Sequence, residues 1–164
     1  MNRRSYLDFV LQVCSRPDID ARVIDERVMY SEDDVAISYQ GGVALVSTVG
    51  SETWHLMTTC GVALDVPDIN GALLWANEQN RRIATGRYYC AIAAQQGMAA
   101  IVLEDGLLGP HLDLNHSPSR SLLLSTIFTM CDDAVHSSRE VLSTYGGRAF
   151  PVDGGEAILA AIRG

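Results

Sequence analysis

The feature that most constrains the fold is a long apolar pattern of period two between Thr53 and Val66. Its even-numbered positions are apolar at nearly every step, namely Trp54, Leu56, Cys60, Val62, Leu64 and Val66. Alternate side chains of an extended strand point to the same face of a sheet, whereas a helix repeats every 3.6 residues. The segment is therefore predicted to be a strand of a sheet with one buried face.

Shorter strand patterns flank this segment and are joined by tight turns. Asp34–Tyr39 and Val43–Val49 are separated by Gln40-Gly41-Gly42. Because glycine adopts positive φ at little steric cost, this pair predicts a hairpin. The remaining strand candidates along the chain are Val23–Tyr30, Arg87–Ala94, Met98–Leu103 and the short segment His111–Leu114. Strands joined by hairpins pair antiparallel.

Capping residues mark the predicted helices. Asp68 precedes an apolar run as a plausible N-cap, and Gly86 is expected to close that helix after Thr85. Ser117-Pro118 supplies an N-cap and a proline in the first turn, which is typical of a helix start. The expected helices cover residues 4–14, 68–85, 117–143 and, as a short final helix, Glu156–Ile162.

The order of these elements predicts an α+β fold. A helix precedes three strands, a second helix follows, and two or three strands lead to the long helix (α-β-β-β-α-β-β(-β)-α). Strands that bunch in antiparallel hairpins form one sheet, and we expect the helices to pack on one side of it. Residues 1–145 are expected to form the domain, and residues 146–164 a C-terminal tail that carries the short helix.

Charge and composition exclude several classes of protein. The net charge of −8 disfavours nucleic acids and anionic membranes as partners. All twelve basic residues are arginine, which excludes Schiff-base enzymes and Walker A phosphate loops, because both need a lysine. The apolar run after Arg3-Arg4 is broken by Asp8 and Gln12, and no stretch approaches 18 apolar residues. We therefore expect a cytoplasmic protein without a signal peptide or membrane span.

Residues able to perform chemistry are scattered. His111, Asp113 and His116 share one loop and are the best candidates for a metal or acid–base site, although such loops are more often simply solvated. The carboxylate runs Glu32-Asp33-Asp34 and Asp132-Asp133 are typical of a turn and of a solvated helix face. The cysteines are expected to be reduced and buried, and they lack zinc-ligand spacing: Cys14, Cys60, Cys90 and Cys131. The sequence thus predicts neither catalysis, nor a cofactor, nor a metal.

Two helices carry more apolar surface than one core face needs. In the first, the polar residues Ser5, Asp8 and Gln12 form only a thin stripe, whereas a surface helix buries an apolar arc of a little over ~100°. A second subunit, a client peptide or the C-terminal helix would cover the surplus, and the alternative is full burial within one subunit. In the second helix, Leu74 points nearly opposite the core side and Trp75 lies on a flank. Both indicate a contact surface.

One polar residue is expected on the core side of the second helix. Asn80 shares that face with apolar residues, namely Ile69, Leu73, Ala76 and Ile83. A buried amide needs hydrogen-bond partners. We expect Asn80 to find them on the backbone of a strand or turn, in a structural role.

One segment carries a family resemblance: Leu73-Leu74-Trp75-Ala76-Asn77-Glu78-Gln79-Asn80-Arg81-Arg82, followed by Gly86-Arg87-Tyr88-Tyr89. In this segment, in the order of its elements and in its acidic composition, the chain resembles the YbjN-type domains, which are similar in fold to the class I chaperones of type III secretion. The resemblance covers residues 4–143. It implies a homodimeric α+β domain that binds extended peptide segments or regulates through such binding, and it carries over no catalytic residues.

The leading hypothesis is a non-catalytic, chaperone-like adaptor or regulator that binds a peptide or protein as a homodimer. The partners are a second copy of the chain and an unidentified client. Tyr6, Phe9 and Val10 are the candidate contacts with the client, and Leu74 and Trp75 are the candidates for the subunit interface.

Two other classes stay open. The alternative is a small-molecule-sensing regulatory domain, with a pocket between the sheet and the helices lined by Trp54 and Tyr88. The last is a hydrolase or metalloenzyme built around His111.

Overall fold

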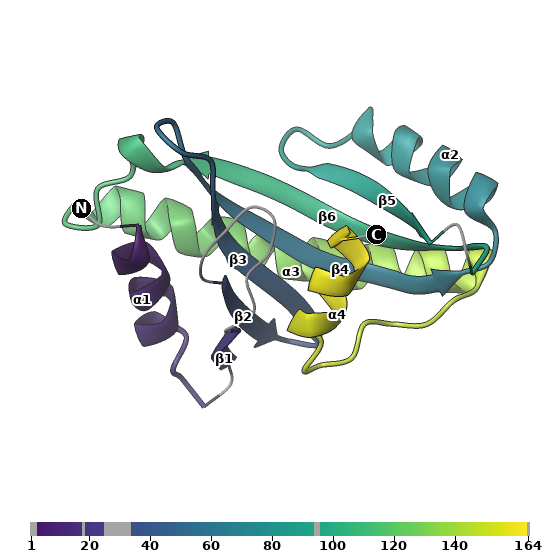
Figure 1. Ribbon diagram of the computed structural model, residues 1–164, viewed down its shortest axis with the longest axis horizontal. Coiled ribbons are helices and arrows are strands. Elements are labelled where there is room, and N and C mark those ends of the chain that lie inside the picture. Colours follow the sequence, from purple (N-terminus) through teal and green to yellow (C-terminus); the bar gives the residue numbers. More distant parts are fainter. Residues whose placement is uncertain (1–2, 18, 25–33, 94–95, 164) are drawn as a thin grey trace.

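The structure is a computed structural model, and it describes residues 3–17, 19–24, 34–93 and 96–163 (Figure 1). Four α-helices, six strands and one 3-10 turn follow one another along the described chain. In chain order they are α1 (Arg4–Val13), β1 (Ile19–Ile24), β2 (Asp34–Tyr39), β3 (Gly42–Val49), β4 (His55–Val66), α2 (Ile69–Asn80), β5 (Arg87–Ala93), β6 (Met98–Leu108), η1 (Gly109–His111), α3 (Ser117–Tyr145) and α4 (Gly155–Arg163). The α+β class is therefore confirmed.

All six strands belong to one sheet in the order β1-β2-β3-β4-β6-β5, and every neighbouring pair is antiparallel. The predicted hairpin between β2 and β3 forms, with Gln40 and Gly41 both at positive φ in its turn. Four strands precede α2 where three were expected, because β1 pairs with β2. The expected segment Val23–Tyr30 overlaps β1 only at its start, and residues 25–33, including Glu32 and Asp33, lie outside the described residues.

The main core lies between one face of the sheet and the helices α1, α2 and α3. Figure 1 shows α3 running along that face behind the strands, with α1 near one end of the molecule and α2 near the other. The apolar stripes predicted for the long helix pack here, including Leu123, Ile127 and Cys131, which are almost fully buried. These three helices give the sheet its predicted covered side.

The opposite face of the sheet is covered as well, which corrects the expectation of helices on one side only. A second core cluster joins sheet residues to Phe150, Ile158 and Leu159, and the two residues from α4 are at most 1% exposed. In Figure 1, α4 crosses in front of the strands, opposite α3. The segment expected to be a tail thus packs against the sheet through α4, as far as the structure describes it (residues 146–163). Its apolar pattern is visible in the sequence, but its docking face is not.

The strand β4 changes face along its length, and this corrects the single apolar face predicted for it. Its pairing register with β6 shifts between Gly61 and Ala63 and again between Ala63 and Val66. Such β-bulges insert residues that redirect the following side chains. Leu64 therefore packs in the second cluster with Phe150, whereas Val62 and Val66 stay in the main core.

The segment that leads to α4 pairs with β4 at these register shifts. Beyond Cys60, β4 has no partner in β3, and Leu64 instead exchanges two backbone hydrogen bonds of 2.8 Å with Arg148. The Arg148 side chain also pairs with Asp65. Next to them, a Cβ at Gly61 would overlap the Phe150 ring, so this glycine makes room for Phe150. These contacts fix the entry of the chain onto the second face.

The structure differs clearly from the prediction at the end of α2 and in the segment after β6. Asp68 caps α2 as expected, because its carboxylate accepts a hydrogen bond of 2.9 Å from the Gly71 N–H. However, α2 ends at Asn80 and not at Thr85, and a loop of residues 81–86 follows it. After β6 the chain forms the short turn η1, so the expected strand His111–Leu114 is wrong. In the part of the chain that the structure describes, none of the helices combines the length and apolar character needed to cross a bilayer.

Candidate functional site

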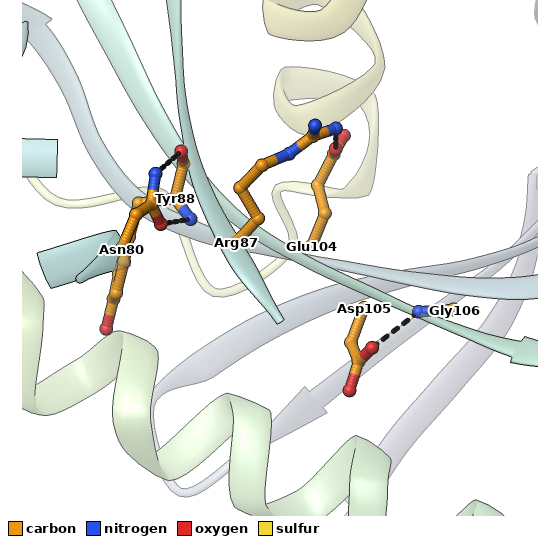
Figure 2. A network of polar contacts seen from close by, with 6 residues as sticks. All are labelled: Asn80, Arg87, Tyr88, Glu104, Asp105 and Gly106. Atoms are coloured by element: carbon orange, nitrogen blue, oxygen red, sulfur yellow. Dashed lines mark hydrogen bonds and ion pairs between the residues drawn. The ribbon is translucent and has the colours of Figure 1, made fainter. Parts of the chain in front are cut away.

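The Asn80 side chain binds the start of β5. Its Nδ2 donates a hydrogen bond of 2.9 Å to the Tyr88 carbonyl, and the Tyr88 N–H donates one of 2.7 Å to its Oδ1 (Figure 2). The expectation that Asn80 satisfies strand backbone is thereby confirmed. Because both groups of one residue are bound, the amide stands where a neighbouring strand would pair. It fixes the 81–86 loop between α2 and β5.

A pocket of about 410 Å³ opens beside this loop, between β6 and α3. Its apolar lining comes from the loop, from β6 and from α3: Ile83, Leu103, Leu107, Leu122 and Met130. Hydroxyl and carboxylate groups line it as well: Tyr88, Asp105, Ser125, Thr126, Thr129 and Asp133. A largely apolar cavity with a few convergent polar groups, in the range of roughly 300–1,000 Å³, is the usual form of a small-ligand site.

The charges around this pocket are negative. Its lining contains two carboxylates, those of Asp105 and Asp133, and no arginine or histidine. Asp105 uses one oxygen to accept a hydrogen bond of 2.8 Å from the Gly106 N–H. Burial raises the pKa of the Tyr88 phenol, as do the nearby charges of Asp133 and Glu140, while the hydrogen bond with Ser137 opposes this rise.

Arg87 lies in sequence between two residues of the pocket lining, Gly86 and Tyr88, but it is turned away from the pocket. Arg87 lies on the opposite face of the sheet from Tyr88 and pairs with Glu104 at 3.7 Å. Figure 2 shows this ion pair pointing away from α3, while the Asp105 carboxylate points toward it. Burial raises the pKa of Glu104, and Arg87 acts in the opposite direction.

The three residues expected to contact a client lie on α1, and two of them are core residues. Tyr6 is 4% exposed and Val10 is fully buried, so their expected surface position is wrong. The Tyr6 hydroxyl donates a hydrogen bond of 2.6 Å to the Leu112 carbonyl, and its ring meets Trp54 edge-on with 5.0 Å between centroids. Phe9 is half-buried and packs against the same core. The surplus apolar surface expected on α1 is thus covered within the subunit.

The two residues expected at the subunit interface differ from each other. Leu74 is 71% exposed, whereas Trp75 is 5% exposed, so the expected surface position of Trp75 is wrong. The Trp75 ring packs edge-on against Tyr88, with 4.9 Å between their centroids. Among the described residues its indole N–H has no hydrogen-bond partner. Trp75 therefore belongs to the packing that supports the pocket wall, and Leu74 alone faces outward.

The residues of the two remaining hypotheses are not brought together. Trp54 lies under α1, away from the pocket that Tyr88 lines, so the pair predicted to line one pocket is separated. In the loop after β6, the Asp113 carboxylate accepts a hydrogen bond from the Asn115 N–H, and His116 contacts Ser119 at 3.3 Å. Within the described ranges, no three His, Cys, Asp or Glu side chains gather as a metal site would require.

The cysteines are free, and Cys14, Cys60 and Cys131 are buried while Cys90 is half-buried. Burial raises the pKa of Cys14 and of Cys90 to about 11. A thiol with so high a pKa is almost entirely protonated near neutral pH and is a poor nucleophile. These cysteines act as small apolar residues of the core.

Sequence reasoning misses the pocket lining, although α3 carries a signal for it. Leu122, Thr126, Thr129 and Asp133 recur at spacings of three and four residues, which places them on one side of a helix. This mostly polar stripe lies directly beside the core stripe, which contains Leu123, Ile127 and Met130. On its own the stripe is typical of a solvated face, because nothing in the sequence places the 81–86 loop opposite it.

No protein-family model matches the chain, and no curated protein matches it significantly. The resemblance to YbjN-type domains therefore rests on the residues that carry it, in α2 and in the strand after it.

Proposed function

We propose that this protein is a non-catalytic binding domain that self-associates and holds an extended segment of a partner polypeptide at the α2–β5 edge of its sheet. The observation that supports this is the distribution of exposed apolar side chains. In the described chain six large ones are exposed, and four of them lie on α2 and the β5–β6 hairpin: Leu74, Tyr89, Ile92 and Met98. We call this set the edge surface.

The backbone of β5 supports pairing with an added strand. β5 is the last strand of the sheet, so one of its edges has no neighbouring strand in the part of the chain that the structure describes. Asn80 occupies that edge at Tyr88. Because strand residues alternate in direction, the N–H and C=O groups of Cys90 and Ile92 face the same open edge. Added strands gain affinity from such main-chain groups and selectivity from the neighbouring side chains.

The side chains on both sides of this edge are apolar. Cys90 contacts α2 through the Ala72 carbonyl, so Ile92, two residues along, projects on the same face of the sheet as α2. Tyr89 projects on the opposite face, and both Ile92 and Tyr89 are 45% exposed. Natural proteins usually protect an open edge with charges, proline or a covering segment. Among the described residues the Asn80 amide occupies this edge at the start of β5, and we expect a second copy or a client strand to cover the remainder.

The test is an Ile92→Pro substitution, measured by sedimentation velocity over a concentration series. Proline at this position removes only an N–H that points outward, so the pairing of β5 with β6 is kept while strand addition is blocked. We expect the wild-type chain to form dimers, and Ile92→Pro and Leu74→Ser to shift the equilibrium to monomers.

The matched control is Val152→Ser, which removes another exposed apolar side chain, 62% exposed, outside the edge surface. It is expected to leave association unchanged. Client binding is tested with an array of extended peptides, to which wild type binds and Ile92→Pro does not. A wild-type chain that stays monomeric at the highest attainable concentration and ignores every peptide would refute the proposal.

The pocket between α3 and the 81–86 loop favours a second candidate function, the sensing of a small molecule. Its volume and its mixed lining are those of a ligand site. A ligand there would touch Tyr88 on β5, beside the edge surface, so that binding in the pocket and association at the edge would influence each other.

A further inference from the structure

We propose that the pocket between α3, β6 and the 81–86 loop binds a small organic cation, a protonated amine carried on an apolar body. This inference gives the ligand class for the second candidate function and does not depend on self-association at the edge surface. Four features of the pocket support it: its fixed wall, its apolar floor, its carboxylates and its lack of basic groups.

The wall of the pocket is held in place by specific contacts. Asn80 binds both backbone groups of Tyr88, which anchors the far end of the 81–86 loop. At Gly86, φ is +77° and a Cβ would lie 3.1 Å from the Glu104 carbonyl oxygen, so glycine permits the close approach of this loop to β6. Tyr88 is held by an edge-on contact with the Trp75 ring and by the hydrogen bond between its hydroxyl and that of Ser137. A preformed wall lowers the ordering cost of binding.

The floor of the pocket is apolar, with Leu103 and Leu107 from β6 and Met130 from α3. Leu103 and Met130 are themselves buried in the main core, so the pocket reaches down to it. A volume of about 410 Å³ accommodates a small organic molecule and far exceeds the space of a single ion. A hydrated metal ion would leave this floor unused, whereas an alkyl or aromatic body would cover it.

The charged groups favour a cation over an anion. The Asp133 carboxylate makes no hydrogen bond or ion pair to any described residue, and Asp105 binds the Gly106 N–H with one of its two oxygens. Glu140 adds a third negative charge near Tyr88. No arginine or histidine lines the pocket, and the chain contains no lysine. An anionic ligand would meet uncompensated repulsion here.

An ammonium group fits these partners better than a divalent metal ion does. Calcium takes six to eight oxygen ligands, and the described lining offers two carboxylates. An ammonium group needs only three acceptors. The carboxylates and the hydroxyls of Thr126 and Thr129 supply acceptors of the required kind around the pocket.

The experiment compares three probes of equal length on the full chain: hexylammonium, hexan-1-ol and hexanoate. Affinity is measured by titration calorimetry, and the location by methyl NMR shifts of Met130 and Thr129. We expect hexylammonium to bind most tightly and hexanoate not at all. Asp133→Asn and Asp105→Asn are each expected to weaken hexylammonium about tenfold, the usual scale for one charge-assisted contact, while leaving hexan-1-ol unaffected.

The matched control is Asp132→Asn, which removes the same charge from the adjacent residue of α3, outside the pocket lining. It is expected to leave all three affinities within about twofold, because an exposed charge outside the pocket is largely screened by solvent and salt. Retained hexan-1-ol binding shows that the variants are folded. The inference is overturned if hexanoate binds as well as hexylammonium, if Asp132→Asn weakens the amine as much as Asp133→Asn does, or if no probe shifts the Met130 and Thr129 methyl signals.

Discussion

The helices α1 and α2 were both expected to present surplus apolar surface, but the apolar side chains in question are buried on α1, whereas one of them stays exposed on α2. On α1, Tyr6 and Val10 are buried within the subunit, and Tyr6 packs against Trp54, which precedes β4, and binds the carbonyl of Leu112, which follows β6. On α2, no described segment lies over Leu74, and it remains 71% exposed.

The difference arises from other segments of the chain and not from the helices themselves. The loop after β6 carries the Leu112 carbonyl that binds Tyr6, so a connecting segment completes the enclosure of α1. The loop after α2 is turned inward by Asn80 and builds the pocket wall instead of covering Leu74. An apolar surplus on a helix therefore indicates that something covers it, and only the path of distant loops decides whether the cover comes from the same chain.

The largest expected difference between the two helices is in the free energy of unfolding that is lost when one leucine of each is truncated. Leu7 of α1 is 1% exposed, and Leu7→Ala is expected to lower the free energy of unfolding by about 3 kcal/mol, as large-to-small changes in a core do. Leu74→Ala on α2 is expected to change it by less than about 0.5 kcal/mol. Urea unfolding measures both, and comparable losses from the two variants would show that the Leu74 side chain is not exposed as described.

A smaller effect is expected at the residue that directs the loop after α2. Asn80→Leu leaves the Tyr88 N–H and carbonyl without their partner, and we expect a loss of about 2 kcal/mol in the free energy of unfolding. Asn80→Asp keeps an acceptor for the N–H and loses the donor to the carbonyl, so its loss should lie between wild type and Asn80→Leu. Equal stability of all three proteins would mean that the amide does not hold β5.

The enclosure of α1 is tested by a change of still smaller size. Tyr6→Phe removes the hydroxyl that binds the Leu112 carbonyl and keeps the ring against Trp54, so we expect a loss of about 1 kcal/mol. The control is Tyr39→Phe, whose hydroxyl accepts an exposed hydrogen bond from Gln40 and should contribute less than about 0.5 kcal/mol. Thermal unfolding of wild type and the two variants measures these losses, and equal melting temperatures would contradict the expected order.

Local patterns predicted much of this fold because their physical causes are local. The Gln40-Gly41 turn, the Asp68 cap and the inward Asn80 each depend on residues close in sequence or on a partner that any sheet supplies. Leu64 was assigned to the wrong face because a bulge leaves no trace in an alternating apolar pattern. The predicted end of α2 at Thr85 is five residues too late, because it was inferred from Gly86. The positive φ of Gly86 serves the turn into β5 instead.

The site was harder to predict than the fold. Asp133 and Thr129 are ordinary polar residues of a helix surface until the 81–86 loop stands opposite them. That placement depends on the pairing of Asn80 with Tyr88, which joins two elements across a loop whose path the sequence does not specify. The helical periodicity of α3 indicates the stripe, and only the tertiary structure gives it a facing wall.

The late position of α4 in the chain has a consequence for how the protein is made. All six strands leave the ribosome before Phe150 and α4, so the face that receives Leu159 stays bare while the rest of the sheet is already synthesised. Uncovered apolar strands on a nascent chain attract neighbouring chains and chaperones. The space beside Gly61 that accepts the Phe150 ring is therefore filled only after all six strands have been synthesised. Substitutions at Gly61 should reduce the yield of native protein more than they change the packing on the other face of the sheet.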